Sequence, residues 1–132
     1  MAILINKILD EVRVLGCSDL HFTNGINPVV RLNGQLRKMS GYEEMNEEGI
    51  LEIVEQMTNE QQRRSIAQHK DTDFSFTTRS GYRHRVNVFF QRGFTAIAIR
   101  LLRKDETGKI KEKDYAVIEL PTGDFGRFIQ LP

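Results

Sequence analysis

Arg85 and Arg100 are the two side chains whose type and spacing best suggest chemistry in this 132-residue chain. They lie in the stretch RHRVNVFFQRGFTAIAIR, residues 83–100, where alternating apolar residues predict two strands joined by a turn at Gly93. If both apolar sets share one face of the hairpin, Arg85 lies directly opposite Arg100. Like charges in that position destabilise a sheet, but two facing guanidinium groups can clamp a phosphate through bidentate hydrogen bonds. The hairpin therefore predicts an anion site.

Two readings of these arginines remain open at the level of the sequence. A third arginine, Arg92 at the turn, can either join the pair or simply keep the loop soluble. Alternatively, Arg85 and Arg100 pair with acidic side chains elsewhere, such as Asp71, Asp73 or the glutamate-rich segment described below. The same register sets two further pairs opposite each other: Asn87 with Ala98, and Phe89 with Ala96.

No complete catalytic or metal-binding set accompanies the arginines. The phosphate-binding motif G-x-x-x-x-G-K-[ST] is absent from the sequence, so the chain lacks the cradle of a P-loop enzyme. The three histidines show no metal-ligand spacing, and Asp19 and His21 on one predicted strand are a weak signal for a metal. We therefore expect no metal site and no catalytic residue within this chain.

The elements that must position the arginines follow from periodicity and turn signals. Apolar residues at helical spacing predict a helix over 2–16, and Thr58 with Gln61 resembles the capping box that opens a helix. The complete order is a helix, three short strands, two helices and three strands: 2–16; 18–23, 28–32 and 35–39; 46–57 and 58–68; 72–78 and the hairpin over 83–101. Sequential strands with helices grouped between them predict an α+β domain with an antiparallel sheet.

Composition and charge narrow the class of protein. With 39% hydrophobic and 28% charged residues, the chain reads as one soluble globular domain, and no apolar run approaches a membrane span of about 20 residues. Its single cysteine fits a reducing compartment, which predicts a cytoplasmic location. Residues 39–62 carry seven glutamates and no Lys or Arg, whereas residues 74–104 carry no Asp or Glu. The net charge of only +1 argues against a nucleic acid as the partner.

Several motifs together resemble a known family. The stretches CSDLHFTNGINPVVRLNGQL (17–36), DTDFSF (71–76), RVNVFFQRG (85–93) and IAIRLL (97–102) occur in the order and wording of the N-terminal domain of PilT-type secretion ATPases. These are hexameric motors related to the type IV pilus and type II secretion ATPases. The wording is closer to the retraction branch, which drives twitching motility, than to the assembly branch.

The resemblance implies a PAS-like domain over 1–103 and a linker-like tail over 104–132 that leads to a RecA-like ATPase domain not contained in this chain. In the family, the N-terminal domain packs on the ATPase domain of the neighbouring subunit of a homohexamer. The resemblance then implies that Arg85 and Arg100 reach bound ATP across that interface. The parent ATPase would use ATP and Mg²⁺ in the cytoplasm, at the inner face of the membrane, where the pilus inner-membrane platform is its partner.

Two expectations complete the sequence-based picture. The chain by itself should hold no cofactor and hydrolyse no ATP, because it lacks the P-loop lysine and the Mg²⁺-binding hydroxyl. The alternative functions are a free-standing nucleic-acid-binding domain or a PAS-type domain that senses a small ligand. Residues 104–132 depart from the family pattern, and only VIELP (117–121) echoes the usual linker.

Overall fold

The computed structural model describes residues 3–102, so the predicted linker over 104–132 lies outside the described part. The elements, in chain order, are α1 (Ile5–Val14), β1 (Asp19–Phe22), β2 (Val29–Leu32), β3 (Gln35–Lys38), α2 (Glu47–Met57), α3 (Glu60–Ala67), β4 (Thr72–Thr77), β5 (Arg83–Gln91) and β6 (Phe94–Leu101). The predicted α+β class with an antiparallel sheet is confirmed.

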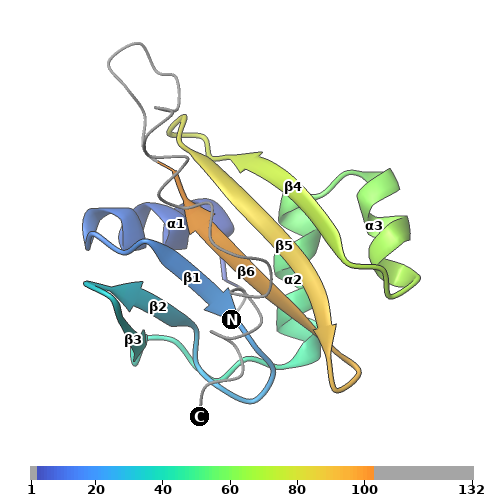
Figure 1. The fold of residues 1–132 in the computed structure, drawn as a ribbon, viewed down its shortest axis with the longest axis horizontal. Coiled ribbons are helices and arrows are strands. Elements are labelled where there is room, and N and C mark those ends of the chain that lie inside the picture. Colours follow the sequence, from blue (N-terminus) through green and yellow to red (C-terminus); the bar gives the residue numbers. More distant parts are fainter. Residues whose placement is uncertain (1–2, 103–132) are drawn as a thin grey trace.

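All six strands form one sheet in the order β3-β2-β1-β6-β5-β4. Each neighbouring pair is antiparallel, and β1 and β6, which are far apart in the sequence, lie side by side in the middle of the sheet (Figure 1). This central pairing joins the N-terminal half of the domain to the long β5–β6 hairpin. The pairing also determines which side chains of the N-terminal half lie beside the arginines of the β5–β6 hairpin.

The register of the β5–β6 hairpin is the predicted one. Arg85 lies opposite Arg100, Asn87 opposite Ala98 and Phe89 opposite Ala96. Because side chains of a strand alternate between faces, these residues share one face of the hairpin, and the buried valines and isoleucines point to the other. The two strands therefore use one face to build the core and the opposite face to carry the arginines.

Within residues 3–102, the helices lie on the apolar face of the sheet and not on the opposite one. Figure 1 shows α1 and α2 behind the sheet, with α3 beyond β4 at its edge. Four apolar residues of α1 recur at helical spacing, and α2 contributes four more: Ile5, Ile8, Leu9 and Val12; Ile50, Ile53, Val54 and Met57. None of the helices between residues 3 and 102 is long and apolar enough to cross a membrane.

The capping box of α3 lies one residue later than the sequence suggested. Asn59 accepts a hydrogen bond from the Gln62 backbone N–H at 2.8 Å, and the Gln62 side chain accepts from the Asn59 N–H at 2.9 Å. Thr58 instead ends α2, where its hydroxyl donates to the Val54 carbonyl at 2.7 Å. The predicted pair of Thr58 with Gln61 is therefore wrong, because asparagine competes well for the N-cap and the threonine already has a carbonyl partner one turn back.

The centre of the sheet should control stability in a graded way. Ile99 is fully buried on β6, between Leu20 of β1 and Val86 of β5. We expect Ile99→Ala to lower the free energy of unfolding by about 2–5 kcal/mol, and the matched Ile99→Val by about 0.5–1.5 kcal/mol. Urea denaturation followed by circular dichroism measures both. An alanine variant as stable as the parent would contradict this account of the core.

Candidate functional site

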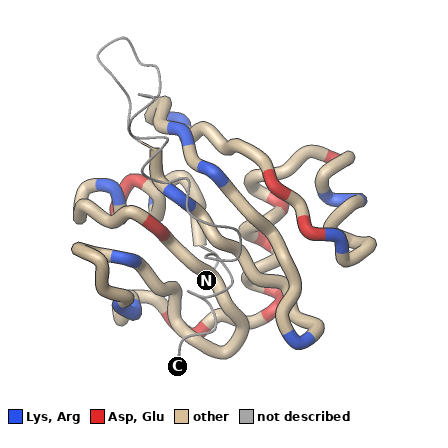
Figure 2. The backbone as a smooth tube through the Cα atoms, in the orientation of Figure 1, with Lys and Arg blue, Asp and Glu red and all other residues tan. Residues whose placement is uncertain are grey.

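A row of charged side chains crosses the sheet face that no helix of the described region covers. Arg31 of β2 lies opposite Asp19 of β1, Asp19 lies opposite Arg100 of β6, and Arg100 lies opposite Arg85 of β5. Figure 2 shows the pattern as a red segment on β1 between blue segments on β2 and β6, with a further blue segment on β5. We call these four residues the arginine row. It contains three cations and one anion, so positive charge is in excess.

A buried ion pair lies at the centre of the arginine row. Arg100 Nε donates to Asp19 Oδ1 at 2.8 Å, and the two side chains are only 3% and 4% exposed. The second carboxylate oxygen of Asp19 accepts from the Ser18 hydroxyl at 2.7 Å and lies 4.0 Å from Arg31 Nε. A charge removed from water must be paired and hydrogen-bonded to be tolerated, and Asp19 meets that need for Arg100.

Asp19 also explains how Arg85 and Arg100 can face each other. The acids considered from the sequence were Asp71, Asp73 and the glutamate-rich segment, but the acid that pairs with Arg100 is Asp19. Asp73 instead accepts a hydrogen bond from Asn87 at 3.0 Å. The sequence signal for Asp19 was its position at the start of the first strand. That signal becomes informative only when β1 is known to pair with β6.

The three arginines of the row differ in their access to solvent. Arg100 is 2% exposed, whereas Arg85 is half-buried and the Arg31 side chain is 25% exposed. Arg31 also donates from Nη1 to the Gly34 carbonyl at 3.0 Å, in the turn between β2 and β3. Arg85 is therefore the more accessible member of the predicted pair, with Arg100 held beside it by Asp19.

His21 lies on the same face, two residues along β1 from Asp19. It is 1% exposed, and burial lowers its pKa to about 4, with Asp19 opposing the shift and Arg100 and Arg31 adding to it. The imidazole is therefore neutral at pH 7. In the described range 3–102, no group of three His, Cys, Asp or Glu side chains lies together in a way that could hold a metal ion.

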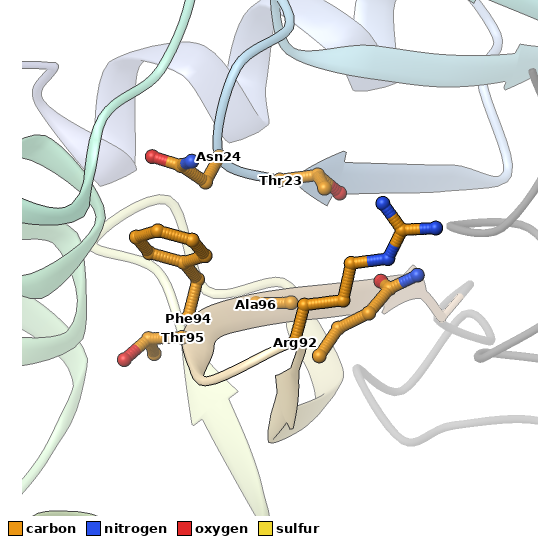
Figure 3. Close-up of a pocket in the computed structure, with 7 residues that line it drawn as sticks. Thr23, Asn24, Arg92, Phe94, Thr95 and Ala96 are labelled. Atoms are coloured by element: carbon orange, nitrogen blue, oxygen red, sulfur yellow. The ribbon is translucent and has the colours of Figure 1, made fainter.

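Arg92 does not join the other two predicted residues. It lies in the turn after β5, seven residues from Arg85, which is about 20 Å at the rise of an extended strand. There it lines an open cleft of about 340 Å³ together with Phe94 and the loop that follows β1 (Figure 3). One phosphate cannot contact Arg92 and the Arg85–Arg100 pair at the same time, so the structure separates these predicted site residues into two places.

The described fold is similar to one part of larger ATPases of known structure. It matches the crystal structure of the pilus retraction motor PilT with bound ADP at a TM-score of 0.71 and 33% identity, over 78% of this chain and 30% of that chain. The ATPase DotB of Legionella pneumophila matches at a TM-score of 0.66 over 86% of this chain and 33% of that chain, and at 18% identity it shares the fold alone. The described fold thus corresponds to one region of these larger proteins.

The curated relatives narrow the class to a family. No protein-family model matches the chain. The type IV pilus retraction ATPase PilT of Pseudomonas aeruginosa is 31% identical over 124 residues, covering 90% of this chain and 36% of that protein. The type IV pilus ATPase PilU of the same organism is 33% identical over 94 residues, covering 71% of this chain and 24% of that protein. The chain thus spans about a quarter to a third of the length of these relatives. It belongs to the PilT-type secretion ATPases and corresponds to their N-terminal region.

Removing the anion of the arginine row should be costly. We expect Asp19→Ala to lower the free energy of unfolding by about 3–5 kcal/mol, because it leaves Arg100 charged and buried without this carboxylate. The control is Asp73→Ala on the exposed edge strand β4, which should change stability by about 0.5 kcal/mol or less. Chemical denaturation measures both variants. Equal losses for the two would show that the buried pair is not special.

The double variant Asp19→Leu with Arg100→Met tests whether Asp19→Ala is unstable because of an unpaired buried charge or because of lost packing. Replacing both charges by apolar side chains of similar volume should recover most of the stability lost in Asp19→Ala. If the double variant is as unstable as Asp19→Ala, loss of packing rather than an uncompensated charge is the cause.

Stability should also fall in mild acid because of two buried histidines. His84 has a pKa lowered to about 4, chiefly by burial and next by Arg13, as burial does for His21. Arg13 Nη2 donates to His84 Nε2 at 3.2 Å, so the neutral ring must use Nδ1–H to donate to the Phe76 carbonyl at 3.2 Å.

Both folded-state pKa values lie below the unfolded value of about 6.5, so the unfolded chain binds more protons in acid. The stability that comes from keeping the two histidines neutral is therefore fully present above pH 6.5. As the pH falls toward 4, each histidine lowers the free energy of unfolding by up to about 1.4 kcal/mol per pH unit. Denaturation at pH 7 and at pH 5.5 tests this, and His21→Gln should show a smaller difference between the two pH values than the parent. An unchanged difference in that variant would contradict the assignment.

Proposed function

We propose that this chain is the N-terminal, PAS-like domain of a hexameric type IV pilus retraction ATPase, and that its arginine row completes the nucleotide site of the adjacent subunit. The single observation that supports this most is that Arg85 and Arg100 lie directly opposite each other, on a sheet face that the helices of residues 3–102 leave uncovered. The named relatives, PilT and PilU, support the choice of a pilus ATPase.

Arg85 would make the first contact with the phosphates of ATP. Arg85 is half-buried on β5, whereas Arg100 is almost fully buried and donates through Nε to Asp19. A planar guanidinium fork can give two parallel hydrogen bonds to phosphate oxygens, which a lysine ammonium cannot. Arg100 on the neighbouring strand would add positive charge.

The chemistry assigned to the pair is electrostatic. An arginine supplied from a neighbouring subunit stabilises the charge that develops on the transferred phosphoryl group and responds to the presence of the γ-phosphate. ATP and Mg²⁺ would be bound by the RecA-like ATPase domain of the parent protein, because this sequence contains no P-loop motif. By the same reasoning, the 132-residue chain alone would be inactive.

The proposal includes the setting of the parent protein. The partners of this domain would be the RecA-like ATPase domains of its own and the adjacent subunit in a homohexamer. The assembly would work in the cytoplasm against the inner face of the membrane, where a pilus platform receives its motion.

Loss of Arg85 in the longer protein that carries this domain should abolish turnover without unfolding the domain. We expect Arg85→Ala to reduce ATP hydrolysis by about 10³-fold or more if the side chain acts as a full arginine finger. Arg85→Lys should remain strongly impaired because lysine keeps the charge but not the fork. Arg37→Ala, an exposed arginine on the edge strand β3, is the matched control and should leave turnover within about twofold.

Mixed hexamers test whether Arg85 acts across the interface. Subunits with Arg85→Ala are mixed with subunits whose P-loop lysine is replaced, so that some interfaces join an intact arginine to an intact P-loop. If Arg85 acts in trans, ATP hydrolysis follows the fraction of such interfaces. Activity that depends only on the number of intact P-loops, or a variant whose only defect is lower stability, would contradict the proposed role.

A further inference from the structure

The sheet face that carries the arginine row is buried at its centre, although no helix of residues 3–102 covers it. We call it the open face. Three of its central residues, His21, Ala96 and Ala98, are 1%, 1% and 0% exposed. At the edge of the same face, Asp73 and Ser75 of β4 are exposed. A sheet face in contact with water normally presents solvated side chains, so the centre of the open face does not have the exposure of a free surface.

The neighbouring strands do not account for the burial of His21. Its partners across the sheet are Val29 of β2 and Ala98 of β6, and both side chains are shorter than an imidazole. Side chains of a sheet stand roughly perpendicular to it, so the His21 ring rises above both neighbours. A ring in that position should be partly exposed unless further atoms lie over it.

The nearest long side chains are engaged elsewhere. Arg100 donates to Asp19 at 2.8 Å, and Arg31 donates to the Gly34 carbonyl at 3.0 Å. The structure is that of a single chain, so the atoms that bury His21 belong to the chain itself. Because no helix of residues 3–102 lies on this face, we look for the cover in residues 103–132.

The composition of residues 114–126 fits the open face. They include Asp114, Glu119 and Asp124, no Lys or Arg, and the apolar run Ala-Val-Ile just before Glu119. Residues 103–113, in contrast, carry five Lys or Arg against three acids and a single aliphatic residue. The arginine row holds three guanidinium groups and one carboxylate, so it is complementary to a segment with three acids.

The chain between Leu102 and Asp114 is long enough for this contact. It has 11 residues, which span up to about 35 Å when extended. The eight residues of β6 span only about 26 Å. Leu102 follows the end of β6 that carries Arg100, so residues 114–126 can reach any part of the open face.

We propose that residues 114–126 lie across the open face of their own chain and cap the arginine row. Apolar side chains of this cap cover His21, Ala96 and Ala98, and its carboxylates pair with Arg85. The cap and a nucleotide of an adjacent subunit would use the same arginine. If the proposed nucleotide contact holds, docking of that subunit therefore displaces the cap.

The test is an NMR titration of the histidine rings in the 132-residue chain. The pKa of His21 should be about 4 in the parent, because burial lowers it. The triple variant Asp114→Lys, Glu119→Lys, Asp124→Lys reverses the charge of the cap and should release it. We then expect the His21 pKa to rise by at least about one unit, toward 6.5. His84, buried on the helix-covered face with a pKa also lowered to about 4, should not change.

A matched triple variant reverses three acids outside the cap. Asp105→Lys, Glu106→Lys, Glu112→Lys makes the same change in total charge and should leave the His21 pKa at its parent value. Equal effects of the two triple variants, or no effect of either, would overturn the proposal. A His21 pKa that rises when the parent is diluted about tenfold would also overturn it, because a second copy of the chain would then be the cover.

A spin label locates the cap without relying on titration. Thr122→Cys in a Cys17→Ala background provides a single thiol within the cap for a nitroxide. The label should broaden the amide signal of Ala98 more than those of Ile8 and Ile53, whose helices lie behind the sheet. Equal broadening on the two sides of the sheet would contradict the cap. Neither experiment needs an ATPase domain, so failure of the cap leaves the proposed role of Arg85 untouched.

Discussion

The pairing of β1 with β6, secured by the buried contact between Asp19 and Arg100, is the constraint on which the rest of the structure depends. It joins residues 81 positions apart at the centre of the sheet. Two charges that are only 3% and 4% exposed lose most of their hydration, and their attraction offsets that loss only in good geometry. A slip of one residue between these strands would turn Asp19 toward the apolar core and leave Arg100 without it. The ion pair therefore penalises a wrong register more than it adds stability.

The sequence was sufficient to predict features that depend on residues close together along the chain. Alternation and the turn at Gly93 determined the register of β5 and β6, because a two-residue turn fixes how its flanking strands pair. The partner of Arg100 could not be found in this way. Asp19 meets it only through a long-range pairing that no local pattern encodes, so nearby acids such as Asp73 looked equally suitable. The predicted start of α3 was wrong for a local reason. Thr58 and Asn59 are adjacent and both are good N-cap residues, so the sequence pattern did not distinguish between them.

The two ends of the β5–β6 hairpin solve different physical problems. At the Arg85 end, a like-charged pair is tolerated because a third strand brings an acid into the same row. At the Arg92 end, the strain is in the backbone, and no neighbouring strand relieves it. The sequence left open whether Arg92 acts together with Arg85 and Arg100, since it shows spacing along the chain but not the length of the strand. An extended strand rises about 3.3 Å per residue and a helix about 1.5 Å. Two residues seven positions apart are therefore about twice as far apart in a strand as they would be in a helix.

The charge balance of the row also accounts for arginine rather than lysine at its centre. Asp19 has two oxygens, and it uses one for Arg100 Nε and the other for Ser18, with Arg31 nearby. The row itself thus holds one carboxylate and three guanidinium groups. A guanidinium can give Nε to this acid and still present its two terminal nitrogens along other directions, whereas an ammonium is a single point charge. Lysine at position 100 would satisfy Asp19 but would lose the rigid plane that keeps the charge beside Arg85. The row therefore depends on the shape of the arginine side chain as well as on its charge.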